Sequence, residues 1–216
     1  MGVIVGKALD TRTPVFLEEM KYLTFQPYWN VPASILTKEI LPAMRKNPGY
    51  LAAHDMEIVN GQGDDGKVVA QSPETLAALS KGKLRVRQRP GSKNSLGPVV
   101  FVFPNDDNVY MHGTPAPALF ERSRRDLSHG CIRLEDPVKL AEWVLRDRPE
   151  WTRGKILEAM RGKPGTRVGL TSPVRVVLYY VTATVIPSEG AIHFADDIYD
   201  QDPKLDKALH AAMHSP

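Results

Sequence analysis

The sequence contains one cysteine among its 216 residues, so no disulfide can close within the chain. It has no apolar run of about 18 residues, the length that a membrane-spanning helix requires, so we expect no transmembrane segment. It also lacks a basic segment followed by an apolar leader, so we expect no signal peptide in this chain. Internal repeats, low-complexity tracts and glycine-rich phosphate loops are missing too, which argues against repeat architectures and phosphate-loop nucleotide binding.

An excess of one charge is also lacking. The chain has 28 Lys and Arg residues and 25 Asp and Glu residues, which gives a net charge of +3 and a pI near 8.9. This balance suits an acidic partner, but no RNA-binding aromatic signature or zinc finger is present, so we expect no nucleic-acid partner. Basic residues gather over 81–93. Alternation through Arg85–Arg89 puts the arginines on one face of a strand, which is either solvated or attracts carboxylates and phosphates.

Most histidines show no metal-type spacing: His54, His193, His210 and His214. The remaining two, His112 and His129, lie in the same stretch as Cys131. All three are residue types that bind zinc, so a zinc site is one interpretation of them. We nevertheless expect no metal and no other cofactor.

Apolar and β-branched runs predict a mainly β, α+β domain, and a hydrophobic content of 42% is enough for a buried core. Strands are expected at 3–5, 14–16, 22–25, 99–103, 109–112 and 166–170, at 174–186 as a long central strand, and in a hairpin return over 187–200. Helices are expected at 34–46, where Pro42 breaks or restarts the helix, from Ser72 to Gly82, from Asp136 onward, over 151–160 and in a polar tail from Asp202.

The stretch Tyr110–Arg133 combines the cysteine with two imidazoles. Taken singly, a cysteine is usually a small buried hydrophobe and a histidine a structural residue. Together they are the set that nucleophilic acyl transfer requires, because an imidazole makes the thiolate available at neutral pH. His112 falls at a strand end, and the spacing allows it to meet Cys131. Gly130 lets the chain bend beside the sulfur and exposes backbone N–H groups for an oxyanion.

His112, fifteen intervening residues and then Ser-His-Gly-Cys at 128–131 resemble the signature of the L,D-transpeptidases, the YkuD-type catalytic domain. Many members of that family have asparagine two residues after the cysteine, where this chain has Arg133. Further segments are similar to a YcbB-like subgroup of large periplasmic enzymes: Tyr28–Pro32, Pro48–Leu51, Leu96–Gly97, Phe103–Asn105 and Leu140–Trp143.

The resemblance implies a role for each residue of the site. Cys131 is the nucleophile and His112 the base, and the backbone carbonyl of Gly113 takes the place that a carboxylate has in other triads. Tyr110 belongs to the oxyanion site, and His129 is part of the catalytic motif. The remaining candidates frame the nucleophile and bind substrate: Trp29, Ser128, Gly130 and Arg133.

The implied activity is L,D-transpeptidation of peptidoglycan stem peptides. A thioester on Cys131 forms with release of the terminal D-alanine, and an amine of a neighbouring stem converts it into a 3→3 cross-link. Hydrolysis of the same thioester would instead make an L,D-carboxypeptidase, and a non-catalytic wall-binding module is the alternative outside enzymes. Carbapenem β-lactams are expected to acylate Cys131. The implied location is the periplasm or cell envelope, with this chain cut from a longer secreted protein.

The resemblance also implies an architecture. A β-sandwich-like pair of mixed sheets with helices at its side would form the catalytic domain, from residues 1–28 and 85–200. Residues 29–84 would form an inserted helical subdomain that caps the active site as a substrate lid. A passive packing lobe is the alternative for that insertion. Residues 201–216 would form a C-terminal tail.

Overall fold

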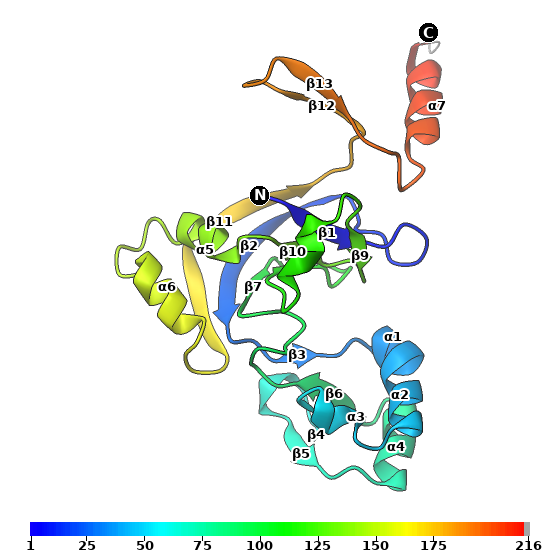
Figure 1. The fold of residues 1–216 in the computed structure, drawn as a ribbon, viewed down its shortest axis with the longest axis vertical. Helices are drawn as coiled ribbons and strands as arrows, with labels where there is room; N and C mark the ends of the chain where they lie inside the picture. Colours follow the sequence, from blue (N-terminus) through cyan, green and yellow to red (C-terminus); the bar gives the residue numbers. More distant parts are fainter. Residues whose placement is uncertain (214–216) are drawn as a thin grey trace.

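A seven-stranded mixed sheet is the largest element of the computed structural model, which describes residues 1–213 (Figure 1). Its strand order is β11-β2-β7-β8-β10-β1-β9. Parallel pairs join β8 to β10 and β1 to β9. The strands are β1 (Val3–Gly6), β2 (Phe16–Phe25), β7 (Val99–Val102), β8 (Met111–His112), β9 (Asp126–Ser128), β10 (Ile132–Leu134) and β11 (Thr166–Leu178). The predicted α+β class with mixed sheets is confirmed, and this sheet is continuous through all seven strands.

Some of the expected strand boundaries are wrong. Segments 14–16 and 22–25 belong largely to one strand, β2, because the alternation of exposed and less exposed side chains continues between them. β11 lies at the edge of the sheet and not at its centre. Its register against β2 shifts between Gly169 and Val174, beside Pro173, which cannot donate to a ladder. Beyond Leu178 the chain leaves the sheet.

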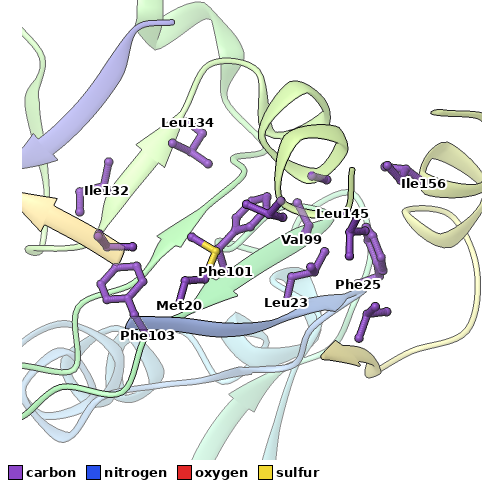
Figure 2. Close-up of a cluster of buried hydrophobic side chains, with 14 of the residues drawn as sticks. Met20, Leu23, Phe25, Val99, Phe101, Phe103, Ile132, Leu134, Leu145 and Ile156 are labelled. Carbon is purple, nitrogen blue, oxygen red and sulfur yellow. The ribbon is translucent and has the colours of Figure 1, made fainter. Parts of the chain in front are cut away.

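The main core lies between the large sheet and two helices, α5 (Pro137–Val144) and α6 (Arg153–Ala159) (Figure 2). Phe25, Phe101 and Phe103 are fully buried in it. Phe25 also stacks on Trp151, with ring centroids 5.3 Å apart. This packing fixes β7, and β7 leads through a loop to β8 and His112.

Residues 29–88 form a second unit, which we call the lobe, with its own sheet and core (below the large sheet in Figure 1). The sheet has the order β3-β6-β4-β5, with β3 (Trp29–Asn30), β4 (Met56–Asn60), β5 (Lys67–Val69) and β6 (Arg85–Gln88). The helices are α1 (Ala33–Ile35), η1 (Leu36–Ile40), α2 (Leu41–Lys46), α3 (Tyr50–Ala53), η2 (Gly63–Asp65) and α4 (Pro73–Ser80).

The inserted subdomain expected as helical over 29–84 therefore also contains a sheet. The helices are present, but the lobe is a mixed unit, and 85–88 belongs to its sheet. Short strands such as β4 carry too few residues to establish a periodicity, so the sequence pattern did not reveal them. The lobe core contains ten buried side chains, so the unit packs around its own interior.

The segment from α1 to α2 shows how Pro42 is accommodated. The α-helix restarts at Leu41, with Pro42 in the first turn of α2. The π-helix η1 ends just before α2, and the Leu41 N–H donates to the Leu36 carbonyl five residues back. A π turn re-registers the hydrogen bonds where proline removes one, and such turns are frequent at functional sites.

Helix caps follow the sequence closely. Ser72 caps α4 by accepting from the Thr75 N–H, and Gly82, with φ of +68°, follows its end. Asp136 caps α5 by accepting from the Lys139 N–H. Both predicted caps are confirmed.

The C-terminal part forms a separate hairpin and a helix that extend away from the large sheet at the top of Figure 1. The hairpin pairs β12 (Ala183–Ile186) with β13 (Ala191–Phe194), and the helix is α7 (Asp202–Met213). The expected hairpin and polar helix are confirmed, while the end of the tail, with His214, lies outside the described residues. Within residues 1–213, every helix is too short or too polar to cross a membrane.

Candidate active site

His112 lies at the end of β8, inside the large sheet. Pairing with the two neighbouring strands sets it opposite Val100 of β7 and Arg133 of β10. The residue is only 4% exposed, and its Nδ1 lies 2.6 Å from the carbonyl oxygen of Gly113. Because a carbonyl can only accept, Nδ1 carries the hydrogen and Nε2 is the basic nitrogen.

Close packing of two backbone segments holds the Gly113 carbonyl. The Gly113 N–H donates to the Val99 carbonyl at 3.0 Å. A Cβ on Gly97 would lie 2.5 Å from the Thr114 nitrogen, and Gly97 has φ of +64°. A Cβ on Gly113 would lie 2.9 Å from Cδ of Pro98. Both positions therefore require glycine, and the loop before β7 supports the turn after His112.

Cys131 follows a tight turn between β9 and β10. Gly130 has φ of +112°, which favours glycine. The Ser128 hydroxyl donates to the Cys131 carbonyl at 2.6 Å and accepts from the Gly130 N–H at 3.2 Å. That N–H is therefore engaged within the turn rather than free for an oxyanion. The Cys131 thiol donates to the Asn108 carbonyl, 3.8 Å away.

Residues distant in sequence support this turn. Thr13 Oγ1 donates to the Gly130 carbonyl at 2.8 Å. The buried Tyr199 hydroxyl donates to the Gly6 carbonyl at 2.7 Å and accepts from the Thr13 N–H at 3.3 Å. Sequence reasoning missed Thr13 and Tyr199, because no local pattern links residues so far apart.

Burial controls the charge of both reacting groups. It lowers the pKa of His112 from 6.5 to about 4, an effect that the Gly113 carbonyl opposes and the Arg133 charge increases. Burial also raises the pKa of the Cys131 thiol above 9.0, against the effects of the Tyr110 N–H and of Arg133. At neutral pH the pair is therefore a neutral thiol and a neutral imidazole.

Tyr110 lies beside the thiol. Burial raises the pKa of its phenol above 10.0, and the neighbouring Tyr22 and Cys131 add to this effect. The hydroxyl therefore keeps its proton at neutral pH and is able to donate to a developing negative charge.

Two cavities meet at Cys131. One, of about 290 Å³, contains His112, Ser128, His129 and Arg133 in its lining. The other, of about 570 Å³, contains Tyr22, Tyr28 and Tyr110. Both are also lined by Trp29, Pro32, Leu96 and Asn108. Residues of the lobe and of the large sheet thus line both cavities, and Trp29 of the lobe lines each of them.

His129 faces the lobe. Its Nε2 lies 2.7 Å from Oε1 of Glu39, in the π-helix η1. Sequence reasoning missed Glu39, whose only local signal was the nearby Pro42 in an otherwise helical segment. The imidazole next to the nucleophile thus links the catalytic turn to the lobe.

Two arginines of the basic strand expected at Arg85–Arg89 are engaged within the lobe, whereas Arg89 is exposed and pairs with Asp55 at 3.4 Å. Arg87 is 6% exposed, pairs with Glu57 at 2.7 Å and lies over the Tyr28 ring. Arg85 donates to Asn30 Oδ1 at 2.8 Å and to backbone carbonyls of the lobe. These two arginines hold the lobe together.

Metal-type donors do not cluster at the site. Within residues 1–213, no three His, Cys, Asp or Glu side chains gather as a metal-binding group. Of the three zinc-type residues considered above, His129 contacts Glu39 and His112 contacts Gly113.

The mixed sheet thus carries a cavity in which a buried histidine and the cysteine lie together. The family model YkuD, described as the L,D-transpeptidase catalytic domain, matches residues 1–176, and the chain belongs to this family.

A relative from Haemophilus influenzae, named "Putative L,D-transpeptidase", is 34% identical over 206 residues. The match covers 95% of this chain and 41% of the relative, so the chain spans about two fifths of the length of the curated relative it matches. The narrower similarity to YcbB-like enzymes stays a prediction.

Proposed function

We propose that the protein is a peptidoglycan L,D-transpeptidase that uses Cys131 as its nucleophile and forms 3→3 cross-links. The observation that carries the proposal is the shared cavity of Cys131 and His112, in which the Gly113 carbonyl fixes the histidine tautomer. Membership of the YkuD family supports the substrate class, the stem peptides of peptidoglycan.

A side chain of the protein is available for each proton transfer and each attack in the proposed reaction. Sγ of Cys131 attacks the carbonyl carbon of the penultimate stem residue while its proton passes to Nε2 of His112. The bond to the terminal D-alanine breaks, and its amine leaves with that proton. A thioester remains. The amine of a second stem then attacks the thioester, returns a proton through His112, and leaves the cross-linked product and the thiol.

Tyr110 is the donor we assign to the oxyanion of both tetrahedral intermediates, because its neutral hydroxyl lies near the thiol. Ser128 and Gly130 position the turn rather than contact the substrate, since their hydrogen bonds lie within it. Trp29 and Arg133 line the cavity and are the substrate-binding candidates.

The lobe is proposed to act as a cap over the substrate. Its residues Trp29, Pro32 and Ile35 form one wall of the smaller cavity, and Glu39 contacts His129 beside the nucleophile. These contacts favour a substrate lid over a passive packing lobe, because they place the lobe against the cavity that contains His112 and Cys131.

An L,D-carboxypeptidase is the second candidate. Water can replace the acceptor amine, and the cavity beside Cys131 is open to solvent because the residue is only partly buried. The two reactions share acylation of Cys131 and differ only in what resolves the thioester.

The test is product analysis of purified stem tetrapeptides by mass spectrometry, with the protein and with Cys131→Ala. Cysteine-dependent cross-linked dimers with loss of D-alanine are expected. Tripeptide alone would identify a carboxypeptidase. Binding to peptidoglycan without any cysteine-dependent product would overturn both enzymatic functions and favour a wall-binding module.

Two further proposals depend on this function. Carbapenems are expected to acylate Cys131, because their strained carbonyl resembles the acyl donor. An intact-mass increase that persists in Cys131→Ala would contradict this. A periplasmic or cell-envelope location follows from the substrate, and fractionation of cells expressing the full-length protein tests it.

A further inference from the structure

Arg133 stands beside both reacting groups. It lies in β10, one strand from His112 and paired with it in parallel register, so the two side chains emerge on the same face of the sheet. It also lines the smaller cavity together with Cys131. The charge of Arg133 lowers the pKa of both His112 and Cys131, as expected of a neighbouring cation.

The guanidinium of Arg133 has no partner for its buried nitrogen. Its Nε is buried and makes no hydrogen bond within the described residues. Arg87, which is 6% exposed, shows the usual arrangement, with a carboxylate partner and an aromatic ring against it. Asp107 lines the same cavity as Arg133, but no ion pair joins them in residues 1–213. A buried donor without a partner is costly, which favours a ligand that supplies the acceptor.

The chemistry of the site identifies that ligand. A planar guanidinium beside solvent-accessible space is suited to a carboxylate, which accepts two parallel hydrogen bonds. His112, the proposed donor to the leaving amine, is the direct neighbour of Arg133. In a terminal amino acid the carboxylate is attached to the same α-carbon as the amine. A cation next to the acid that protonates the amine therefore lies where the carboxylate of the leaving residue has to be.

We propose that Arg133 binds the free C-terminal carboxylate of the donor peptide and thereby restricts cleavage to the last peptide bond. This inference rests on the proposed function and adds the residue that recognises the C-terminal carboxylate of the donor peptide.

The test compares two donor tetrapeptides, one with a free C-terminal carboxylate and one with a C-terminal amide. Release of the terminal residue is measured with the protein, Arg133→Gln, Arg133→Lys and Cys131→Ala. For the unmodified protein, amidation is expected to lower kcat/KM about 10- to 100-fold, the effect of one charge-assisted hydrogen bond. Arg133→Gln should lose a similar factor on the free acid and discriminate between the donors by less than about 3-fold.

Arg133→Lys is the matched control, because it keeps the charge but loses the planar fork, and an intermediate preference is expected. A folding control accompanies each variant. Arg133→Gln removes a buried group without a partner, so its thermal midpoint should be equal to or above that of the unmodified protein. Alkylation of Cys131 by a small neutral reagent measures the part of the loss that comes from the missing charge beside the thiol, and that part should be the same for both donors.

Equal turnover of both donors by the unmodified protein would overturn this inference alone. An unchanged preference for the free acid in Arg133→Gln would overturn it as well. Absence of cysteine-dependent turnover of either donor would overturn the proposed function, and the inference with it.

Discussion

At the scale of single residues, the site depends on groups that are kept neutral by burial. The sheet removes His112 from water, and the backbone hydrogen bonds with Gly113 and Leu96 compensate for only part of that loss. The thiol of Cys131 is likewise kept protonated. Such a pair contains less thiolate at neutral pH than a preformed thiolate–imidazolium pair.

The buried neutral state of His112 predicts a pH-dependent stability. Its pKa falls from 6.5 in the unfolded chain to about 4 in the folded one, so the unfolded chain binds more protons between these values. The free energy of unfolding should therefore drop as the pH is lowered through this window, by roughly 2–4 kcal/mol from this group. Urea unfolding at several pH values measures it. His112→Gln should show a flatter dependence, and parallel curves for the two proteins would contradict this account.

Gly97 allows a second test at this scale. Gly97→Ala would force a Cβ against the backbone of Gly113 and Thr114 and displace the carbonyl that orients His112. We expect kcat to fall at least about 10-fold, with a stability loss of about 1–3 kcal/mol.

Gly82→Ala is the matched control, since Gly82 has nearly the same φ but open space around its Cβ position. It should lose stability without losing kcat in folded protein. Equal effects of the two substitutions on kcat would show that backbone strain alone is responsible.

The sequence predicted the residues that share one short motif and missed those that depend on tertiary contact. His112 and Cys131 stand at a characteristic spacing, and Gly130 adjoins the thiol. The roles of Tyr199 and Gly97 depend on tertiary contacts between segments that are far apart in sequence. Hydrophobic periodicity does not predict such contacts. Glu39 was missed for the same reason, although Pro42 had marked its helix as irregular.

At the scale of elements, the lobe and the large sheet share the cavity. The helices were predictable because caps and apolar stripes are local, as Ser72 and Asp136 demonstrate. The lobe sheet was not predictable, since its strands are two to five residues long. The single strands β2 and β11 were split in the prediction because polar residues and Pro173 interrupt their apolar pattern.

Contact between η1 and the catalytic turn predicts an effect on substrate binding. Glu39→Gln would weaken the contact with His129, and both side chains are partly exposed, so stability should change by less than about 1 kcal/mol. KM for the donor should rise about 3- to 10-fold, because the lobe wall of the cavity is no longer tied to the turn.

Glu158→Gln, which alters an exposed ion pair on α6, is the control and should leave KM unchanged. A KM for Glu39→Gln equal to that of this control would indicate that the contact with His129 does not help to close the cavity.

At the scale of the whole molecule, the C-terminal segment completes the catalytic domain. The family match ends at residue 176, yet Tyr199 reaches back to Gly6 and Thr13, which support the nucleophile turn. Tyr180 stacks on Tyr199, with ring centroids 5.0 Å apart. The exposed hairpin β12–β13 lies between these two tyrosines in sequence and makes none of these contacts itself.

Tyr199→Phe should therefore affect the active site from a distance. Loss of the hydroxyl leaves the Thr13 N–H and the Gly6 carbonyl without this partner, at a cost of about 1–3 kcal/mol, and kcat should fall with it. Tyr179→Phe is the control, because Tyr179 is 71% exposed. Thermal unfolding and donor turnover measure both effects. Equal behaviour of the two variants would assign Tyr199 no supporting role.

The most direct test of the account is the acyl-enzyme itself. The protein is mixed with donor tetrapeptide, quenched in acid within the first turnovers and weighed by intact-mass spectrometry. We predict a mass increase equal to the donor without its terminal residue, located on Cys131, absent from Cys131→Ala and lost when an acceptor amine is added before the quench. Release of D-alanine by Cys131→Ala at an undiminished rate, with no adduct on the unmodified protein, would contradict the account.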